Sequence, residues 1–326
     1  MSKAIVIHQP GGPENLLWQD VAPPQPGEGQ ALVRHTAVGL NFIDVYHRTG
    51  LYPLPQMPAI IGMEGAGVVE ALGPGVTNDL KVGDRVAYAS APPGAYAQRR
   101  VIAASRLVVL PPGITDQQAA AMMLQGLTTQ YLLRSTYRVQ PGDTILFHAA
   151  AGGVGLIACQ WAKHLGATVI ATAGGEAKLA LAKAHGADHV IDYNKEDFVA
   201  RVREITNGKG VPVVYDSVGK DTFMKSLDCL KPRGVLVSFG QSSGSVPPFD
   251  PGILSVKGSL YLTRPTLMTY TAERADLVSG ASELFEMVQS GKVSIKVNQT
   301  YPLSEAAQAH RDLEARKTTG STVFVV

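Results

Sequence analysis

Residues 144–166, TILFHAAAGGVGLIACQWAKHLG, constrain the fold most strongly, because they predict a strand, a glycine-rich turn and a helix in direct succession. Thr144–His148 is a β-branched and apolar run typical of a buried parallel strand. Val154–Leu165 carries apolar residues at helical spacing, and Gly166 ends it. A helix N-terminus after such a turn presents backbone N–H groups and the positive end of the helix dipole. The turn is therefore suited to bind a pyrophosphate.

The turn matches the dinucleotide fingerprint G-x-G-x-x-G only in part. Ala150 occupies the first glycine position, whereas Gly152 and Gly155 occupy the other two. A tight turn without a ligand is the alternative. The strand before the turn and the helix after it favour a binding site, which would also include Gly153 and Val154.

Length and composition indicate a globular chain of about two domains, since it has 326 residues, 45% hydrophobic and 17% charged. A net charge of +2 and scattered Lys and Arg argue against nucleic acid as the main partner. The N-terminus has too short an apolar run for a signal peptide, and no stretch reaches transmembrane length. We therefore expect a cytoplasmic protein without a membrane partner. Cys159 and Cys229, both in predicted helices, are expected to be buried free thiols.

The first part of the chain alternates short β runs with Gly- and Pro-rich turns, which predicts a small irregular β-barrel. The runs are Lys3–His8, Ala31–Val38, Gly67–Ala71, Arg85–Ala89 and Tyr96–Val101. Thr115 and Gln118 then form a capping-box pattern, which opens a long predicted helix through Ala119–Leu133.

After Gly155, predicted strands and helices alternate, which is typical of a doubly wound parallel sheet. The strands are Thr168–Thr172, His189–Ile191, Val213–Asp216, Val235–Phe239 and Leu260–Leu262, and the helices are Ala177–His185, Phe198–Thr206 and Thr222–Leu230. The last segments cannot easily bury a core alone, so we assign them to the first domain. They are helices Glu273–Ser290 and Ser304–Ala315 and strands Val297–Tyr301 and Val323–Val326. The expected fold is α/β, with a Rossmann-type domain of residues 126–265 inserted into a mainly β domain of residues 1–125 and 266–326.

Several motifs, in order and at characteristic spacing, resemble one enzyme family. They are GLNFIDVYHRTGLYP at 39–53, GMEGAGVVEALGPGV at 62–76, KVGDRVAY at 81–88, FHAAAGGVGLIACQWAK at 147–163 and VVYDSVG at 213–219. The chain resembles the zinc-independent medium-chain dehydrogenases/reductases, and among them the NADPH:quinone oxidoreductases related to ζ-crystallin. The resemblance implies a GroES-like catalytic domain built from both chain ends and a nucleotide-binding domain built from the middle.

The zinc ligands of the related metalloenzymes are missing from this sequence. Gly62-Met63-Glu64 stands where those enzymes have Gly-His-Glu, and no cysteine precedes Cys159. Tetrahedral zinc requires three or four N or S ligands, so we expect no metal site. His47 and His148 are expected to be packed or surface residues. Without a Lewis acid, hydride donation to an already electrophilic acceptor such as a quinone is favoured over alcohol oxidation.

The end of the second predicted strand indicates which nicotinamide cofactor is bound. It carries no carboxylate until Glu176, and Lys178 follows in the next helix, which favours the 2′-phosphate of NADPH over NAD. The resemblance places Gly174, Lys178 and Tyr193 around that phosphate. Glu176 argues against this assignment, and a solvated Lys178 is the alternative.

The resemblance also implies the remaining site residues. Asn41, Tyr46 and Tyr52 would lie near the nicotinamide as the catalytic residues, although the two tyrosines could simply pack a loop. The other cofactor-binding positions are Thr128, Ser217, Phe239, Gly240, Ser242, Arg316 and Lys317. Ser217, Phe239, Gly240 and Ser242 fall at or beyond strand ends, where open α/β sheets bind ligands.

The expected function is hydride transfer from NADPH to a quinone bound between the two predicted domains, as in an NADPH:quinone oxidoreductase. One alternative is an NADPH-dependent reductase of activated C=C bonds in an enal, enone or enoyl thioester. Another is an NADPH- or RNA-binding protein with incidental activity. We also expect a homodimer joined at the edge strand within Gly258–Thr263, since unprotected edges pair readily.

Overall fold

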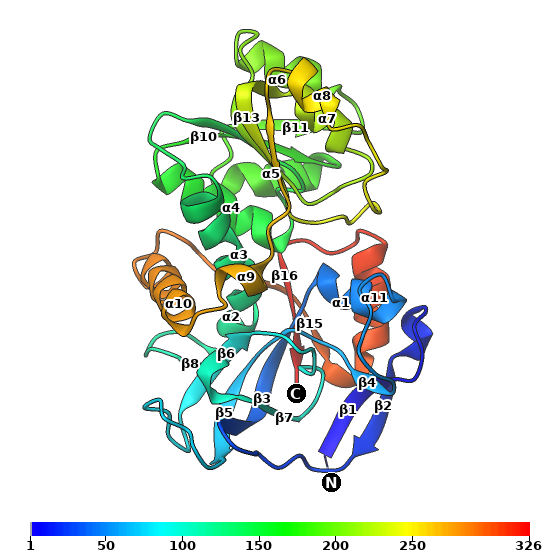
Figure 1. Ribbon diagram of the computed structural model, residues 1–326, viewed down its shortest axis with the longest axis vertical. Helices are drawn as coiled ribbons and strands as arrows, with labels where there is room; N and C mark the ends of the chain where they lie inside the picture. The colour runs from blue at the N-terminus through cyan, green and yellow to red at the C-terminus, as the bar shows by residue number, and fades with distance from the viewer. Residues whose placement is uncertain (1) are drawn as a thin grey trace. The chain divides into compact units, whose positions relative to one another are not determined.

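The computed structural model describes residues 2–326, which form two compact units (Figure 1). The terminal unit comprises the chain up to Leu127 together with Thr271–Gln289 and Ile295–Val326. The middle unit comprises Thr128–Tyr270 and Ser290–Ser294. Both chain ends therefore belong to one unit, and the middle of the chain forms the other.

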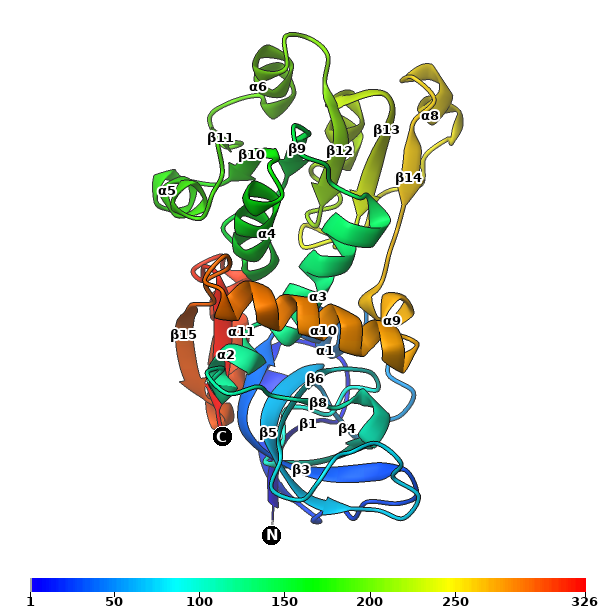
Figure 2. The same cartoon turned by 90° about the vertical axis from the view of Figure 1, so that its left-hand side faces the viewer.

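The middle unit is built on a six-stranded parallel sheet of order β11-β10-β9-β12-β13-β14 (Figure 2). Its strands are β9 (Thr144–Phe147), β10 (Thr168–Ala173), β11 (His189–Asp192), β12 (Val211–Asp216), β13 (Leu230–Ser238) and β14 (Tyr261–Thr263). This order is that of the dinucleotide-binding fold, and the strand order reverses beside β9. The predicted doubly wound sheet is confirmed, with the glycine-rich turn at its switch point.

Helices α4 (Gly153–His164), α5 (Glu176–Ala184), α6 (Phe198–Ile205), α7 (Phe223–Asp228) and α8 (Gly252–Val256) pack around this sheet. The short helix α9 (Leu267–Tyr270) ends the same unit. The helices α4 and α5 contact each other and β10, while α6 contacts α7, which packs on β12 and β13. Every residue of β12 is buried, as expected for a parallel strand covered on both faces. Leu146, Ile170 and Val214 from the sheet pack with Phe198 and Phe223 from the helices.

The terminal unit contains a seven-stranded sheet of order β15-β16-β3-β5-β6-β8, with β7 paired to β3, and a three-stranded sheet of order β2-β1-β4. The strands are β1 (Ser2–Ile7), β2 (Leu17–Val21), β3 (Gln30–Leu40), β4 (Ala59–Ile60), β5 (Glu64–Leu72), β6 (Arg85–Ala89), β7 (Arg99–Ala103), β8 (Val108–Val109), β15 (Val297–Pro302) and β16 (Ser321–Val325). Ile5 and Ile7 share one core with Val33, Val38 and Phe324. The C-terminal strands β15 and β16 thus complete the sheet of the first domain. This agrees with the expectation that the last segments cannot easily bury a core by themselves.

The helices of the terminal unit are α1 (Phe42–Thr49), α2 (Asp116–Ala120), α10 (Arg274–Gln289) and α11 (Ala306–Glu314), and α3 (Met123–Tyr131) begins in it. Short helical turns complete the chain: η1 (Pro13–Asn15), η2 (Ala104–Arg106), η3 (Leu132–Thr136) and η4 (Leu303–Glu305).

The single helix predicted over 119–133 is wrong, because the structure divides it into α2 and α3. The capping box is confirmed: the Gln118 N–H donates to Thr115 Oγ1 at 3.2 Å, and the Thr115 N–H donates to Gln118 Oε1 at 3.1 Å. After α2, however, the Leu124 N–H donates to the buried carboxylate of Glu64 at 2.7 Å. A partner distant in sequence therefore captures an N–H group at the start of α3, and apolar periodicity alone cannot reveal it.

Among the other boundaries that differ from the prediction, two lie on either side of Cys229. The helix predicted over Thr222–Leu230 ends at Asp228, so Cys229 follows α7 and does not lie within it. The Cys229 carbonyl accepts from the Val211 N–H at 2.9 Å, which draws the chain into the sheet, and β13 begins at Leu230. The helix α1 was not among the predicted elements.

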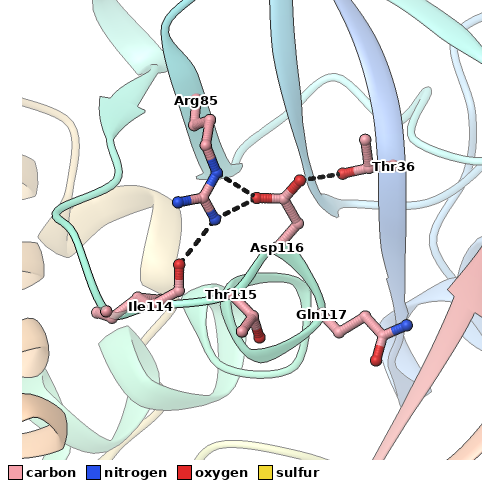
Figure 3. Close-up of a pocket in the computed structure, with 7 residues that line it drawn as sticks. Thr36, Arg85, Ile114, Thr115, Asp116 and Gln117 are labelled. Carbon is pink, nitrogen blue, oxygen red and sulfur yellow. Dashed lines mark hydrogen bonds and ion pairs between the residues drawn. The ribbon is translucent and has the colours of Figure 1, made fainter.

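The start of α2 is fixed to the sheet by Asp116 (Figure 3). Its Oδ1 accepts from Arg85 Nε at 2.9 Å, and its Oδ2 accepts from Thr36 Oγ1 at 2.6 Å. Arg85 also donates to the Ile114 carbonyl at 2.7 Å. These groups line a pocket but satisfy one another, so we assign them a structural role.

Candidate functional site

The fingerprint turn joins β9 to α4 at the centre of the parallel sheet. Gly152 is the N-cap of α4 and adopts an extended conformation with φ −81° and ψ 173°, and no side chain caps this helix in the described part of the chain. The Ala150 N–H donates to the Thr172 carbonyl at 3.0 Å, which anchors the turn to β10. The N–H groups of the first turn of α4 thus face a position suited to an anion.

The two glycines at fingerprint positions have different surroundings. A Cβ on Gly155 would lie 2.5 Å from Ala150 Cα and 2.6 Å from the Ala150 carbonyl carbon, so α4 approaches the turn at van der Waals contact. A Cβ on Gly152 would meet only the Ala149 carbonyl oxygen, at 3.3 Å. Gly155 therefore allows close packing of the helix, whereas Gly152 leaves the backbone open to a ligand.

The loops after β10 and β11 come together around Gly174. A Cβ on Gly174 would lie 2.9 Å from both Tyr193 Oη and Asn194 Nδ2. Asp192 Oδ1 accepts from the Gly175 N–H at 3.3 Å and from the Asn194 N–H at 3.0 Å, so one carboxylate fixes both loops. The structure therefore brings together two residues predicted to surround the 2′-phosphate, Gly174 and Tyr193.

The third residue of that group, Lys178, lies in the first turn of α5 and is half-buried. Glu176, which argues against a phosphate at this position, is held by Lys195 at 3.1 Å, and both side chains are largely exposed. An exposed pair of this kind contributes little to stability. Its relevance is that the Lys195 cation partly compensates the charge of Glu176, the carboxylate that argues against a phosphate at this position.

The residues predicted at the ends of β12 and β13 are also close together. Ser217 directly follows β12, and its carbonyl accepts from the Ser242 N–H at 3.1 Å. A Cβ on Gly240 would lie 2.7 Å from that same carbonyl oxygen, so only glycine fits there without a shift. The Phe239 ring lies 5.7 Å from the Phe147 ring of β9. These four predicted residues thus share the carboxyl edge of the sheet.

Asp216, the last residue of β12, organises this edge and was not predicted as a site residue. Its carboxylate accepts from the Val218 and Gly219 N–H groups at 2.8 and 3.1 Å and from the hydroxyls of Thr222 and Ser226. An acidic residue that ends a wholly apolar strand is the signal that could have revealed it.

His148 extends the same buried network and confirms the prediction of a packed histidine. Its ring nitrogens lie 2.8 Å from Thr172 Oγ1 and 3.0 Å from Ser226 Oγ. Burial lowers the pKa of His148, although the Asp216 carboxylate opposes that shift.

The predicted catalytic residues lie in the terminal unit, on and beside α1. The Asn41 N–H donates to Asp44 Oδ2 at 2.9 Å, which satisfies an N–H group at the helix start. The Tyr46 and Tyr52 rings lie edge to face at 5.1 Å, and the Tyr52 N–H donates to the Tyr46 carbonyl at 3.0 Å. The structure thus brings these three residues to one short segment.

Two fully buried carboxyl groups lie beside Asn41, and neither was predicted as a site residue. Burial raises the pKa of Asp44 to about 7 and that of Glu64 to about 8, because a charged carboxylate is poorly solvated there. Tyr96 Oη donates to Asp44 Oδ2 at 3.1 Å and lies 3.0 Å from His310 Nε2. The sequence motifs that contain these carboxyl groups gave no signal of their contacts, because the partners lie far apart in sequence.

The remaining predicted cofactor residues are divided between the units. Thr128 is buried in α3 and belongs to the middle unit. Arg316 and Lys317 follow α11 in the terminal unit, where Lys317 Nζ lies 3.7 Å from Asp312 Oδ1. Their contact with cofactor phosphates stays a prediction.

Residues 2–326 contain no group of three or more His, Cys, Asp or Glu side chains that could hold a metal ion. Cys159 and Cys229 are free and buried, and burial raises the pKa of each thiol to about 12. Within the same residues, no helix combines the length and apolar character needed to cross a membrane.

Comparison with known proteins agrees with this architecture. Residues 27–112 match the alcohol dehydrogenase GroES-like domain family, and residues 153–279 match the zinc-binding dehydrogenase family. The quinone oxidoreductase of Pseudomonas aeruginosa is 56% identical, with 100% of both chains covered. The crystal structure of Escherichia coli quinone oxidoreductase complexed with NADPH superimposes with a TM-score of 0.98 at 49% identity, covering 99% of this chain and 100% of that chain.

A relative with another printed activity is the 2-haloacrylate reductase of a Burkholderia species, 48% identical over 100% of this chain and 99% of its own. The full-length agreement in sequence and fold, together with the GroES-like and nucleotide-binding family matches, identifies the family. The chain belongs to the quinone oxidoreductases of the medium-chain dehydrogenase/reductase family.

Proposed function

We propose that the chain is an NADPH:quinone oxidoreductase that transfers a hydride from NADPH to a quinone without a metal ion. The observation that carries the proposal is the whole-chain likeness to a quinone oxidoreductase whose structure contains NADPH, with a TM-score of 0.98. In this proposal, residues 126–265 bind the cofactor, and residues 1–125 with 266–326 form the catalytic domain.

The residues of the middle unit fit NADPH. The turn Ala150–Gly155 would hold the pyrophosphate through backbone N–H groups, because Gly152 leaves its approach open and Gly155 lets α4 pack closely. Gly174, Lys178 and Tyr193 would surround the 2′-phosphate. The other positions are Thr128, Ser217, Phe239, Gly240 and Ser242 in this unit and Arg316 and Lys317 in the terminal unit. NADPH, when bound, supplies the hydride.

The chain's own contribution is mainly to orient the acceptor. Holding donor and acceptor at reactive distance removes the entropic cost of a bimolecular encounter. The side chain of Asn41 is fixed by hydrogen bonds on both its nitrogen and its oxygen. The hydroxyl of Tyr46 or Tyr52 would donate to the quinone oxygen as negative charge develops there. Quinol formation needs one proton in addition to the hydride, and water can deliver it, so no side chain is assigned as a general acid.

Reduction of an activated C=C bond is the second candidate, and the 2-haloacrylate reductase relative favours it. It would use the same cofactor residues and the same hydride donor. The test is a panel of quinones, enones and 2-haloacrylate at equal concentration, with NADPH oxidation corrected for the uncatalysed rate. Higher kcat/KM for quinones supports the proposal. Higher kcat/KM for 2-haloacrylate or enones would favour the second candidate, and no turnover of either class would favour a binding protein.

We extend the proposal to a homodimer joined through β14. This strand is the edge of the parallel sheet, and Tyr261 is 62% exposed on it while Leu262 is 36% exposed. An unprotected edge with apolar side chains favours pairing with a second copy. Sedimentation should show a dimer for the wild type and a monomer for Tyr261→Glu. Val82→Glu, at a residue with the same 62% exposure in the terminal unit, is the matched control and should stay dimeric.

We also propose a cytoplasmic location. The free thiols of Cys159 and Cys229 are consistent with a reducing compartment. Cell fractionation with antibodies against the chain would test this, and recovery in a membrane or secreted fraction would contradict it.

A further inference from the structure

A chain of buried hydrogen bonds runs through the terminal unit from Glu64 to Ser321. Asn41 Nδ2 donates to Glu64 Oε2 at 2.7 Å, and Gln125 Nε2 donates to Asn41 Oδ1 at 3.2 Å. Ser321 Oγ then donates to Gln125 Oε1 at 2.6 Å. Glu64 lies in β5, Asn41 is the N-cap of α1, Gln125 lies in α3 and Ser321 in β16, and all four are buried. Segments far apart in sequence thus converge on the Asn41 amide.

The carboxylate of Glu64 determines which group donates and which accepts in this series of hydrogen bonds. An ionised carboxylate only accepts hydrogen bonds, whereas an amide carries a donor at one end and an acceptor at the other. Glu64 Oε1 accepts from the Leu124 N–H, so Oε2 requires the Asn41 NH2 group on its side. The Asn41 oxygen must then face Gln125. One N–H of the Asn41 NH2 group is used by Glu64, and the second points in a direction that Glu64 determines.

The fold makes room for this carboxylate. Glu64 is 0% exposed, and among residues 2–326 no Lys or Arg forms an ion pair with it. A Cβ on Gly39 would lie 2.4 Å from Glu64 Oε2 and 2.2 Å from the Ala120 carbonyl oxygen, so any larger residue would displace the carboxylate. A buried carboxyl without a cation is costly, and its retention beside Asn41 indicates a task other than stability.

We propose that Glu64 is a positioning residue that sets the orientation of the Asn41 amide, and thereby the direction of the N–H group that Asn41 offers to the acceptor. The inference rests on the proposed function, because the acceptor is the quinone of that proposal. Glu64 itself touches neither cofactor nor acceptor in this account. It acts only through Asn41.

Protonation of Glu64 would reverse the donor-to-acceptor direction of this series of hydrogen bonds. A carboxylic acid at Oε2 carries a donor, which favours the Asn41 oxygen on its side and turns the amide over. The titratable and charged groups around it are the Asp44 carboxyl on α1, the Tyr88 hydroxyl on β6 with the Arg100 guanidinium 4.7 Å over its ring, the Tyr96 hydroxyl, and the His35 ring on β3. Burial raises the pKa of Glu64 to about 8, so both orientations are accessible near neutral pH. The orientation that the structure shows is then favoured as pH rises through about 8.

The test compares wild type with Glu64→Gln, which keeps the shape but places a donor against either Leu124 or Asn41. The matched control is Glu70→Gln, on the same strand, where Glu70 pairs with Arg99 at the partly exposed surface. Measurements are kcat and KM for 2-methyl-1,4-naphthoquinone between pH 6 and 9, and Kd for NADPH.

We expect wild-type kcat to rise with an inflection near pH 8, as Glu64 ionises. Glu64→Gln should lose that inflection and fall about tenfold in kcat above it. This loss is smaller than the about hundredfold or more expected when an oriented donor is removed, because the Asn41 amide stays in place and only its orientation is released. Glu70→Gln should follow wild type.

Two results would overturn the positioning role: an unchanged inflection in Glu64→Gln, or a kcat within twofold of wild type at pH 9. Should Glu64→Gln fail to fold, the Asn41 NH2 resonance of 15N-asparagine-labelled wild type provides the answer, since it must shift with a midpoint near pH 8. A resonance that does not titrate contradicts the proposal. Absence of quinone turnover by wild type would instead defeat the proposed function, and the NMR titration would still decide whether Glu64 orients Asn41.

Discussion

The packing of α4 against the fingerprint turn predicts a specific cost for Gly155→Ala. Gly155 is the third residue of α4, and an added Cβ would lie 2.5 Å from Ala150 Cα and 2.6 Å from the Ala150 carbonyl carbon and oxygen. Backbone atoms cannot rotate away as a flexible side chain can. Carbon atoms in contact lie about 3.5–4.0 Å apart, so α4 must withdraw by about 1 Å.

The magnitude follows from two opposing effects on the free energy of unfolding. Overpacking in a well-packed region costs about 1–3 kcal/mol. Replacing glycine by alanine within a helix recovers up to about 1 kcal/mol through helix propensity and a less flexible unfolded chain. Because the clashing atoms belong to the backbone, the overpacking cost lies in the upper part of its range, about 2–3 kcal/mol. After subtraction of the recovery, we expect Gly155→Ala to destabilise the middle unit by about 1–2 kcal/mol.

Gly152→Ala provides the matched control from the same turn. Its backbone, with φ −81° and ψ 173°, suits any residue, and its Cβ would meet only one oxygen, at 3.3 Å. Its stability should change by less than about 0.5 kcal/mol, because the strain is small. Its NADPH affinity should nevertheless fall at least as much as that of Gly155→Ala, because the new methyl group faces the predicted pyrophosphate position.

Trp161 makes the assay specific. The chain has two tryptophans, and Trp161 is 1% exposed on α4 within the middle unit. In a Trp18→Phe background, urea unfolding followed by tryptophan fluorescence reports the middle unit. If the Gly155→Ala curve coincides with that of its parent, or if Gly152→Ala is the less stable variant, the packing described for the turn is wrong.

Two further predictions concern cofactor choice and pH. Lys178→Ala should weaken NADPH binding by roughly tenfold, up to about a hundredfold, because a hydrogen bond to a charged group contributes about 1.5–3 kcal/mol. NADH lacks the 2′-phosphate, so its binding should stay almost unchanged. Equal losses of affinity for both cofactors in fluorescence titrations at fixed salt would refute the contact between Lys178 and the 2′-phosphate. Burial lowers the pKa of His35 from 6.5 to about 4, so in that window it is neutral when folded and protonated when unfolded. The contribution of neutral His35 to the free energy of unfolding is present above pH 6.5 and is lost as the pH falls towards 4. The free energy of unfolding in urea should therefore fall less steeply between pH 6.5 and 4 in His35→Gln than in wild type. Equal pH dependence of the two proteins would contradict this.

The sequence is sufficient to predict the fold class because the relevant signals are local. Most strands of the parallel sheet contain a short apolar run, and the predicted helices between them have apolar residues at helical spacing. The succession of β9 and α4, for example, follows directly from residues 144–166. The C-terminal strand β16 pairs with β3. This pairing agrees with the assignment of the last segments of the chain to the first domain.

Contacts between distant segments could not be predicted in the same way. At the start of α3, the Leu124 N–H donates to Glu64, which lies sixty positions away in the sequence, and apolar periodicity carries no information on such a partner. The burial of the Asp44 and Glu64 carboxyl groups could not be predicted for the same reason, because distant segments of the sequence enclose them. Their residue types predict exposure, and only the assembled strands and helices show that both are enclosed.

The predicted cofactor residues at strand ends came together because parallel strands bring their carboxyl ends to one edge. Ser217 and Gly240 illustrate this, since their positions follow from the ends of β12 and β13. The resemblance, rather than any pattern of spacing, supplied Asn41, Tyr46 and Tyr52, and their chemical roles stay proposals.

The central claim is tested most directly by steady-state turnover of 2-methyl-1,4-naphthoquinone with NADPH and with NADH, in buffer containing a chelator and after subtraction of the uncatalysed rate. The account predicts saturable NADPH oxidation that matches quinol formation, is unaffected by the chelator, and has a kcat/KM about tenfold or more above that with NADH. Turnover that is absent, that requires added metal, or that is equally efficient with NADH would contradict it.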